Sequence, residues 1–471
     1  MDNVLRQITN PYLPSWEYIP DGEPYIFDGR VYVYGSHDKF GGDVYCMGDY
    51  VCWSADVGDL GNWRYEGVIY TKSDDPENGD LQGNLYAPDV TVGPDGRYYL
   101  YYVLSNLGIV SVAVCDEPAG RYEFYGYVHY SDGTRLGERE GDEPQFDPGV
   151  ITEGDFTYMY TGFCAIPEKT RHGAMCTCLG PDMLTIVKDP VFIVPATHNS
   201  IGTAYEGHAF FEAPSIRKKD GKYFFIYSSQ VCRELCYATS ESPDRDFEYR
   251  GVLVDNGDIG IDTYKRADMP GCYCANNHGS IIRINDEWYI FYHRHTNGTN
   301  YSRQGCFEKL KEREDGGFYQ SMITSCGSVA FTQKGFYPAY LACNLFTDEE
   351  KLDVPWQGWM DDRFPKITQE GRDGDEVNGY VCNMTDGARA GFKYFKCTGA
   401  KITSVRTKGY AKGELEVRIK WDGSCLGSYP IDYANVWHDI KKEVMIPDGI
   451  NDLYFTFRGE GHLQFAGFTF E

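Results

Sequence analysis

The chain has 471 residues, more than one hydrophobic core usually supports, so we expect one large domain and one smaller domain. It carries 70 Asp and Glu residues against 44 Lys and Arg residues, which gives a net charge of −26. Because this charge repels phosphate groups and anionic lipids, we exclude nucleic acids and membrane surfaces as partners. No run of apolar residues approaches the roughly 18 that a membrane-spanning helix needs.

The chain contains 16 Cys residues, but its first residues, Met1–Pro11, lack the basic start and apolar run of a secretory signal peptide. We therefore expect a cytoplasmic protein with reduced cysteines. Two close pairs, Cys176 with Cys178 and Cys272 with Cys274, lack the CxxC spacing of structural zinc sites. Buried free thiols are the simplest interpretation, and we predict no metal at these cysteines.

One pattern repeats along most of the chain. After an extended lead-in over residues 1–20, a short strand, a tight turn and an aromatic-rich strand follow one another in each copy. The five copies begin 61 to 65 residues apart, at Asp21, Tyr86, Asp147, Glu212 and Asn277. Such a period is typical of a radial β-propeller, whose units cannot bury their apolar faces alone. We predict a five-bladed β-propeller over residues 1–340.

Residues 345–471 lack this repeat. They alternate short strand-like runs with Gly-containing turns, as in Leu415–Trp421 and Leu463–Phe470. Short alternating strands over a segment of this length are typical of a β-sandwich. The predicted fold class is therefore all-β, a five-bladed propeller followed by a β-sandwich domain.

Three of the five repeats start with an acidic residue, namely Asp21, Asp147 and Glu212. One acidic residue near a turn usually does no more than bond backbone amides. Three at equivalent positions of a propeller converge around the central axis, although they lie far apart in sequence. Opposed carboxyl groups across a cleft are what glycosidic cleavage requires, one as general acid and one as base or nucleophile. These three residues are the candidate catalytic groups.

The motifs around these residues together resemble glycoside hydrolase family 43. They are Asp21-Gly-Glu-Pro, Tyr34-Gly-Ser-His-Asp38, Tyr86-Ala-Pro-Asp89, Phe146-Asp-Pro-Gly149, His208-Ala-Phe-Phe-Glu-Ala-Pro214, Asn277-His-Gly-Ser280, Tyr292-His-Arg-His295 and Ser302-Arg-Gln-Gly305. The resemblance covers all five predicted blades and implies an inverting glycosidase of the β-xylosidase, α-L-arabinofuranosidase or arabinanase type. We expect exo action on an oligosaccharide and no required cofactor.

The resemblance also implies a role for each carboxyl group. Glu212 matches the general acid, Asp21 the general base, and Asp147 the carboxylate that tunes the acid. Glu23 is the alternative base, because it stands three residues before the strand-opening Ile26, as Asp147 does before Val150. The family pattern favours Asp21.

Three further residues match substrate-binding positions of the family. Tyr86 stands where a sugar platform is common, Arg303 matches an arginine that contacts substrate hydroxyls, and His278 matches a histidine near the propeller axis. Several relatives hold calcium near that histidine, although calcium prefers oxygen ligands, so a structural calcium ion near His278 is the only metal we consider. The lesser candidates, each interpreted as structural, are His37, Asp38, Asp89, His293 and His295.

The C-terminal segment, with Asp386-Gly-Ala-Arg-Ala-Gly391, resembles a family 6 carbohydrate-binding module, and both a sugar-binding and a packing role stay open. A retaining fructosidase would carry Asn-Asp-Pro-Asn-Gly, Arg-Asp-Pro and Glu-Cys motifs, which this chain lacks. A non-catalytic carbohydrate-binding propeller is the other alternative, although its strand heads would be expected to lose their carboxylates. The sequence separates neither xylosides from arabinofuranosides nor one oligomeric state from another.

Overall fold

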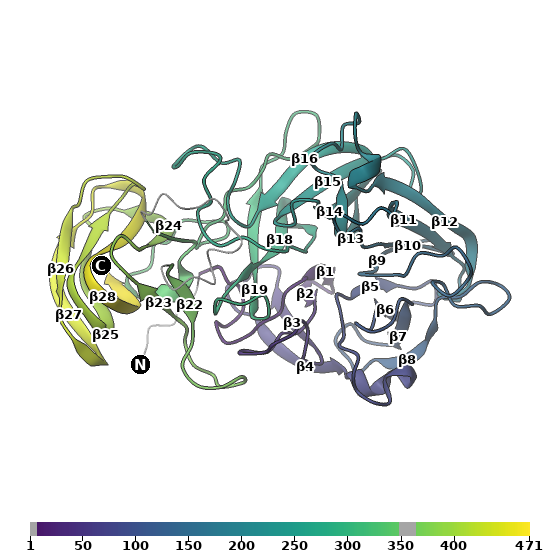
Figure 1. The fold of residues 1–471 in the computed structure, drawn as a ribbon, viewed down its shortest axis with the longest axis horizontal. Helices are drawn as coiled ribbons and strands as arrows, with labels where there is room; N and C mark the ends of the chain where they lie inside the picture. The colour runs from purple at the N-terminus through teal and green to yellow at the C-terminus, as the bar shows by residue number, and fades with distance from the viewer. Residues whose placement is uncertain (1–6, 348–363) are drawn as a thin grey trace.

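The computed structural model describes residues 7–347 and 364–471, and it contains two β-domains side by side (Figure 1). The larger domain is a ring of small antiparallel sheets, and the smaller one is a folded sheet at the C-terminal end. The predicted five-bladed propeller and β-sandwich are both confirmed. The helices in the described residues are short 3-10 turns, and none is long and apolar enough to cross a membrane.

Each blade is an antiparallel meander. Blade one contains β1 (Glu23–Phe27), β2 (Arg30–Tyr34), β3 (Tyr50–Asp56) and β4 (Arg64–Tyr70). Blade two contains β5 (Asp89–Val92), β6 (Tyr98–Tyr102), β7 (Ser111–Cys115) and β8 (Glu123–Tyr127). Blade three contains β9 (Gly149–Glu153), β10 (Phe156–Thr161), β11 (Gly173–Leu179) and β12 (Ile186–Pro195). Blade four contains β13 (Phe210–Lys219), β14 (Lys222–Ser229), β15 (Glu234–Ser240) and β16 (Glu248–Asp255). Blade five contains β17 (Ile281–Ile284), β18 (Glu287–His295) and β19 (Arg303–Leu310).

The two innermost strands of each blade are joined by very tight turns. In blade one, Phe27 pairs with Arg30, and the two residues between them, Asp28 and Gly29, have φ values of 48° and 76°. In blade four, Asp220 and Gly221 have φ values of 50° and 81°. Two consecutive residues with positive φ form the hairpin turn that matches strand twist, and Asp-Gly is a preferred pair for it. This local chemistry generates the repeat recognised in the sequence.

The apolar side chains are buried mainly between neighbouring blades. One core joins Tyr34 and Tyr50 of blade one to Leu100 and Tyr102 of blade two. Equivalent cores lie between each successive pair of blades, and the last one, which contains Tyr12, closes blade five against blade one. Since each blade covers the next, the ring is stable only as a closed unit.

The extended lead-in closes this ring. The side chain of Asn10 exchanges hydrogen bonds with the backbone of Phe307 in β19, at 2.8 and 2.9 Å. A parallel bridge between Gly22 and Gly279 then joins the innermost edges of blades one and five. The lead-in therefore fixes the position at which Asp21 enters the first blade.

The C-terminal domain is one nine-stranded sheet folded over a core of its own. Its strands are β20 (Gly335–Pro338), β21 (Asn344–Phe346), β22 (Lys366–Thr368), β23 (Tyr380–Met384), β24 (Arg389–Cys397), β25 (Lys401–Arg418), β26 (Gly427–Ile431), β27 (Ala434–Met445) and β28 (Gly449–Phe470). The long strands β25 and β28 pair along most of their length. β20, which lies in the range predicted for the propeller, pairs with β28.

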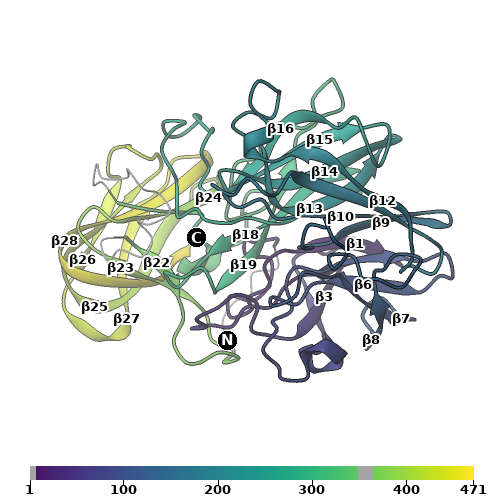
Figure 2. The ribbon, with the colours of Figure 1, turned by 45° about the vertical axis from the view of Figure 1, so that its right-hand side comes forward.

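Blade five is the part of the propeller that faces the sandwich (Figure 2). Lys393 of β24 and Asp258, which follows β16, are both fully buried with their charged atoms 3.9 Å apart. Arg294 of β18 donates hydrogen bonds to the carbonyl groups of Tyr340 and Ala342, at 2.6 and 3.0 Å. These buried polar contacts fix the orientation of the two domains.

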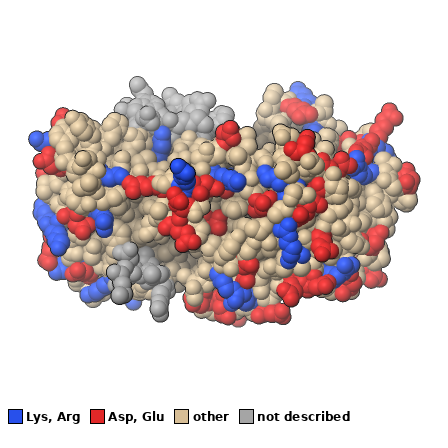
Figure 3. Space-filling view, turned by 90° about the horizontal axis from the view of Figure 1, so that it is seen from below, with Lys and Arg blue, Asp and Glu red and all other residues tan. Residues whose placement is uncertain are grey.

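The negative charge is spread over the surface. Figure 3 shows Asp and Glu side chains distributed over one face of both domains, with Lys and Arg side chains among them. All 16 cysteines are free thiols, and most of them are buried. The surface charge thus forms a diffuse negative field in which neutral ligands bind without an electrostatic penalty.

Candidate active site

The heads of the five blades meet in one cavity of about 420 Å³. Every blade contributes to its wall, and all six residues predicted as catalytic or substrate-binding line it. They are Asp21, Tyr86, Asp147, Glu212, His278 and Arg303. Asp21 and Asp147 are nearly buried, whereas Glu212 is half-buried and open to the cavity. Sequence reasoning therefore found residues that the fold brings together from separate blades.

The backbone is strained where the carboxyl groups enter the cavity. Asp21, Asp147 and Ala213 have φ values of 59°, 46° and 63°, a left-handed conformation that is uncommon for residues other than glycine. Glu212 lies in an irregular part of β13, where the register with β14 shifts on both sides of it. Such irregularities re-aim side chains near functional sites.

A glycine allows blades three and four to approach each other at this point. A Cβ atom on Gly149 would lie only 2.4 Å from the carbonyl oxygen of Pro214, which only glycine avoids. Asp147 lies two residues before Gly149, and Glu212 two residues before Pro214. The Asp-Pro-Gly sequence therefore places the two carboxyl groups near each other, and a hydrogen bond from the Ala213 amide holds Asp147 there.

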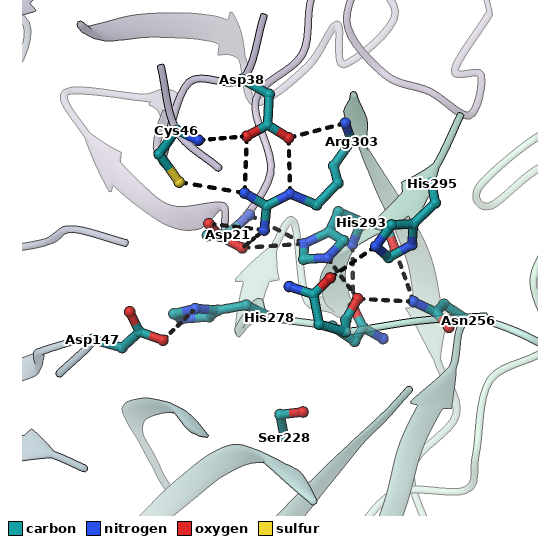
Figure 4. Close-up of polar contacts among 12 residues, drawn as sticks. Asp21, Asp38, Cys46, Asp147, Ser228, Asn256, His278, His293, His295 and Arg303 are labelled. Carbon is teal, nitrogen blue, oxygen red and sulfur yellow. Dashed lines mark hydrogen bonds and ion pairs between the residues drawn. The ribbon is translucent and has the colours of Figure 1, made fainter. Parts of the chain in front are cut away.

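Asp21 is held as a carboxylate by its neighbours (Figure 4). Arg303 Nη1 donates to Asp21 Oδ1 at 3.0 Å, and His293 Nδ1 lies 3.3 Å from the same oxygen. Burial by itself raises the pKa of Asp21, but the Arg303 guanidinium outweighs burial and holds the pKa well below its usual range. Asp21 is thus ionised and able to accept a proton.

Glu212 has the opposite environment. Burial raises its pKa to about 8, and the negative charge of Asp147 acts in the same direction. Burial also raises the pKa of Asp147, to about 7, although the nearby His278 opposes this shift. Glu212 therefore keeps its proton at neutral pH and can donate it. One cavity holds an ionised carboxylate and a protonated carboxylic acid, the pair that acid–base hydrolysis needs.

Glu23, the alternative base, lies outside the cavity wall. Its Oε2 accepts hydrogen bonds from Arg217 at 2.6 Å and from Ser215 at 3.0 Å. Burial raises its pKa, but Arg217 and His278 outweigh this and lower it. Glu23 is therefore a buried ion-pair partner of blade four, and the geometry favours Asp21 as the base.

His278 lies between carboxylates. Its Nδ1 is 3.8 Å from Asp147 Oδ2, and its Nε2 is 3.6 Å from Glu23 Oε1. Burial lowers the pKa of an imidazole, but Glu23, Asp21 and Asp147 outweigh burial here and raise it to about 9. Calcium takes roughly six to eight oxygen ligands, whereas these neighbours surround a cationic imidazole that already neutralises them. The residues around His278 therefore do not fit a calcium cage.

Comparison with known proteins shows which family the chain belongs to. The sequence model described as "Glycosyl hydrolases family 43" matches residues 19–318, well over half of the chain. The chain is also 61% identical, over 99% of both chains, to a xylosidase/arabinosidase from Thermoclostridium stercorarium. The chain belongs to glycosyl hydrolase family 43.

Other similar proteins show how far the similarity extends. A xylosidase/arabinosidase from Bacteroides ovatus is 27% identical, with 60% of this chain and 87% of that protein covered. The solved structure of an arabinoxylan arabinofuranohydrolase from Bacillus subtilis in complex with cellotetraose covers 98% of this chain and 97% of that one, with a TM-score of 0.53 and 21% identity. This last match shows that the two-domain fold recurs over its whole length.

The cavity of this family 43 protein has an aromatic wall, of which the sequence predicted Tyr86 alone. Ring centroids lie 5.5 Å apart for Tyr86 and Phe146, 4.9 Å for Phe146 and Phe163, and 5.3 Å for Phe163 and Phe211. Phe146 and Phe211 directly precede Asp147 and Glu212, which is the one local signal that could have indicated them. The remaining unpredicted lining residues are Tyr45, Cys46, Ala87, Ser105, Cys232 and Asn276.

Two residues that sequence reasoning ranked as lesser candidates support the base. The Asp38 carboxylate accepts hydrogen bonds from Arg303 Nε at 2.8 Å and Arg303 Nη2 at 3.0 Å. The backbone amide of Asp21 donates to His293 Nδ1 at 3.3 Å. Arg303 therefore bridges two carboxylates, with a two-pronged contact to Asp38 and a single nitrogen on Asp21. Its predicted contact with substrate hydroxyls stays a prediction.

The other lesser candidates make structural contacts. His37 lies 3.0 Å from Glu17 Oε1, and His295 Nε2 lies 2.8 Å from Asn276 Oδ1. Asp89 accepts hydrogen bonds from Tyr25 and from the Val150 amide, both at 2.7 Å, and does not line the cavity. These groups fix the blades around the axis.

One cluster outside the cavity contains residue types that ligate metals. Within the described part of the chain, His208, Glu234 and Cys236 place one ligand atom each within 4.8 Å of the others. His208 Nδ1 lies 2.6 Å from Glu234 Oε1, and the Cys236 thiol lies 3.4 Å from the same oxygen. Hydrogen bonding accounts for these contacts, and burial raises the pKa of Cys236 well above its usual range, so its thiol is protonated.

Proposed function

We propose that this protein is an inverting, exo-acting glycosidase that releases xylose or arabinofuranose from short plant-derived oligosaccharides. The observation that carries the proposal is the opposite protonation of two carboxyl groups in one cavity. The pKa of Asp21 is held well below its usual range, whereas that of Glu212 is raised to about 8. A single site can thus supply a proton and accept one at the same pH.

In the proposed reaction, Glu212 donates its proton to the glycosidic oxygen as the bond between this oxygen and the anomeric carbon breaks. A water molecule adds its oxygen to the anomeric carbon from the opposite face, and Asp21 accepts the proton that this water loses. The products are the free sugar and the remaining oligosaccharide, which leaves with a new hydroxyl group. The enzyme ends with Glu212 ionised and Asp21 protonated. Exchange of one proton with solvent restores both groups.

Asp147 and His278 set the protonation state of the acid. The Asp147 charge favours the neutral form of Glu212, and the cationic His278 lies within 3.8 Å of Asp147, where it stabilises that charge. We infer that these two groups position and tune the acid rather than exchange protons with the substrate.

The relatives support the choice of sugar. The protein that is 61% identical to this chain is described as a xylosidase/arabinosidase. A solved β-xylosidase/α-arabinofuranosidase from a compost metagenome is in complex with xylotriose, with a TM-score of 0.52 and 25% identity. The row of Phe146, Phe163 and Phe211 gives the cavity an apolar side that suits the ring carbons of a sugar.

We also propose that the protein works in the cytoplasm, which its 16 free cysteines support. A non-catalytic sugar-binding propeller is the weaker alternative, because such a protein has no need for a protonated and an ionised carboxyl in one cavity. Thiol titration of the native protein tests the location, since intact disulfides would contradict a reducing compartment.

A panel of nitrophenyl glycosides tests the activity and the specificity together. We expect hydrolysis of the β-xyloside, the α-L-arabinofuranoside or both, and loss of that activity in Asp21→Asn. A purified protein that binds xylo-oligosaccharides but hydrolyses none of the panel would overturn the proposal.

A further inference from the structure

The edge of the sandwich reaches the propeller beside the active site. This edge segment, residues 366–379, comprises β22 and the loop that leads to β23. Figure 1 shows β22 on the side of the sandwich that faces β19. The Ile367 carbonyl accepts a hydrogen bond from the Asn297 amide at 2.7 Å, and Thr368 Oγ1 donates to Asn297 Oδ1 at 2.9 Å. One end of the edge segment is therefore bonded to the loop between β18 and β19.

The other end of the edge segment holds a loop of blade one. The Asp373 carboxylate accepts a hydrogen bond from the Phe40 amide at 2.7 Å. Gln369 Oε1 accepts one from the Tyr18 hydroxyl at 2.6 Å, in a buried setting. The Tyr18 and Phe40 rings stack with centroids 5.9 Å apart, and the Tyr18 carbonyl accepts a hydrogen bond from the Asp38 amide at 2.9 Å. The contacts of the edge segment therefore extend through Tyr18 to Asp38, which accepts hydrogen bonds from Arg303.

These two loops meet at the cavity. The blade-one loop, residues 35–49, carries Asp38 and Tyr45, and the blade-five loop, residues 296–302, carries Tyr301. The Tyr45 and Tyr301 rings pack edge to face with centroids 4.8 Å apart. The Arg303 guanidinium lies 4.9 Å from the centre of the Tyr45 ring, and Tyr45 lines the cavity. The edge segment of the sandwich therefore makes hydrogen bonds to both loops, and the aromatic rings of these two loops pack together beside the cavity.

The blade-one loop has little other support over its middle. Lys39, Gly41, Asp43 and Val44 are exposed, and Gly41 has a φ of 73°, which favours glycine. Further along, Asn84 Nδ2 donates to the Tyr45 carbonyl at 3.1 Å. Among the described residues, Asp373 is the hydrogen-bond partner from outside the loop for the stretch between Asp38 and Tyr45, so its loss would loosen this stretch and let the Tyr45 ring shift.

We propose that the edge segment of the sandwich positions the blade-one loop, so that Gln369 and Asp373 are positioning residues for substrate binding through Tyr45. The inference rests on the proposed function of the cavity. It gives the C-terminal domain a part in the active site itself, in addition to the sugar-binding and packing roles that the sequence left open.

Steady-state kinetics on a soluble aryl glycoside test the proposal. We expect Asp373→Ala to raise KM about three- to ten-fold, the loss of one hydrogen bond, with kcat changed less than about twofold. Asp373→Asn keeps an oxygen that accepts from the Phe40 amide, so it should restore the KM of the unaltered protein. Glu443→Ala is the matched control, because Glu443 is an exposed sandwich acid that pairs with Lys401 instead.

A double-mutant cycle separates positioning from general destabilisation. In a Tyr45→Ala background we expect Asp373→Ala to raise KM no further, because the loop then presents no ring to the substrate. Additive effects, or a KM unchanged in Asp373→Ala, would overturn the inference. If the unaltered protein hydrolyses no glycoside, the proposed function itself is refuted. Failure of the positioning role and failure of the proposed function are therefore distinguishable.

A sugar-binding role of the sandwich predicts a different result. A groove of about 630 Å³ lined in part by Tyr380 and Trp437 is the place where a polymer would bind. If Trp437→Ala lowers activity on polymeric xylan while Asp373→Ala leaves small-substrate kinetics unchanged, the sandwich acts as a binding module and the positioning role is wrong.

Discussion

Removing the charge of Asp147 should shift the pH range in which the enzyme works. Glu212 must be protonated to act, so activity falls as pH rises through its pKa of about 8. The charge of Asp147 raises this pKa, and Asp147→Asn should lower it by about one to two units. The protonated fraction of Glu212 at pH 8 then falls from about 50% to about 1–10%. At pH 5.5 it stays above about 75% in both proteins.

The assay compares kcat/KM at pH 8 with kcat/KM at pH 5.5 for each protein. We expect this ratio to fall about five- to forty-fold in Asp147→Asn. A general loss of orientation lowers both rates equally and cancels in the ratio. Asp89→Asn is the matched control, because Asp89 is also buried with a pKa raised to about 7, yet it does not line the cavity. If the pH at which kcat/KM falls on the alkaline side is unchanged or higher in Asp147→Asn, the reasoning is refuted.

Three further outcomes follow from the site. Glu212→Ala should lose about 10²–10⁴ in rate on natural glycosides but much less on aryl glycosides with good leaving groups, and equal losses on both would contradict the acid assignment. Asp21→Asn should be inactive. Glu23→Gln should unfold at a lower temperature, because Arg217 loses its buried partner, but it should keep at least about a tenth of the activity per folded molecule. An inactive but stable Glu23→Gln would reverse the choice of base. Proton NMR should show that the first-formed sugar has the inverted anomeric configuration and that added alcohols are not glycosylated; retention would refute the mechanism.

Much of the site could be predicted because it lies at the heads of repeats. A period of 61 to 65 residues marks equivalent positions, and equivalent positions of a propeller lie around one axis. Asp21, Asp147 and Glu212 were therefore found without any structure. The choice between Asp21 and Glu23 was harder, because both stand within two residues at the same head. Pairing with Arg217 and Ser215 directs Glu23 away from the cavity, and that pairing depends on β13 of another blade.

Most of the residues that sequence reasoning missed lie in connections between strands. The connections between the second and third strands of blades one to four carry Tyr45, Ser105, Phe163 and Cys232, and no local pattern determines their paths. Asn276 lies in the connection before β17. Arg303, Asp21 and Asp38 were all named from the sequence, but their ion pairs were not predicted, since both carboxylates are more than 260 positions away from Arg303 in the chain. Asp373 gave no signal at all, because it is an exposed acidic residue in a chain with many.

The sequence by itself determined the number of blades, the all-β class and the three carboxyl groups, because strands, Asp-Gly turns and repeat spacing are local properties. The family resemblance implies which carboxyl is the acid, and only the tertiary structure gives the three groups different pKa values. All three groups are similar as free side chains, and their pKa values separate because Arg303 reaches Asp21 while Asp147 and burial act on Glu212. Charge interactions depend on distance and burial, and both exist only once the ring has closed.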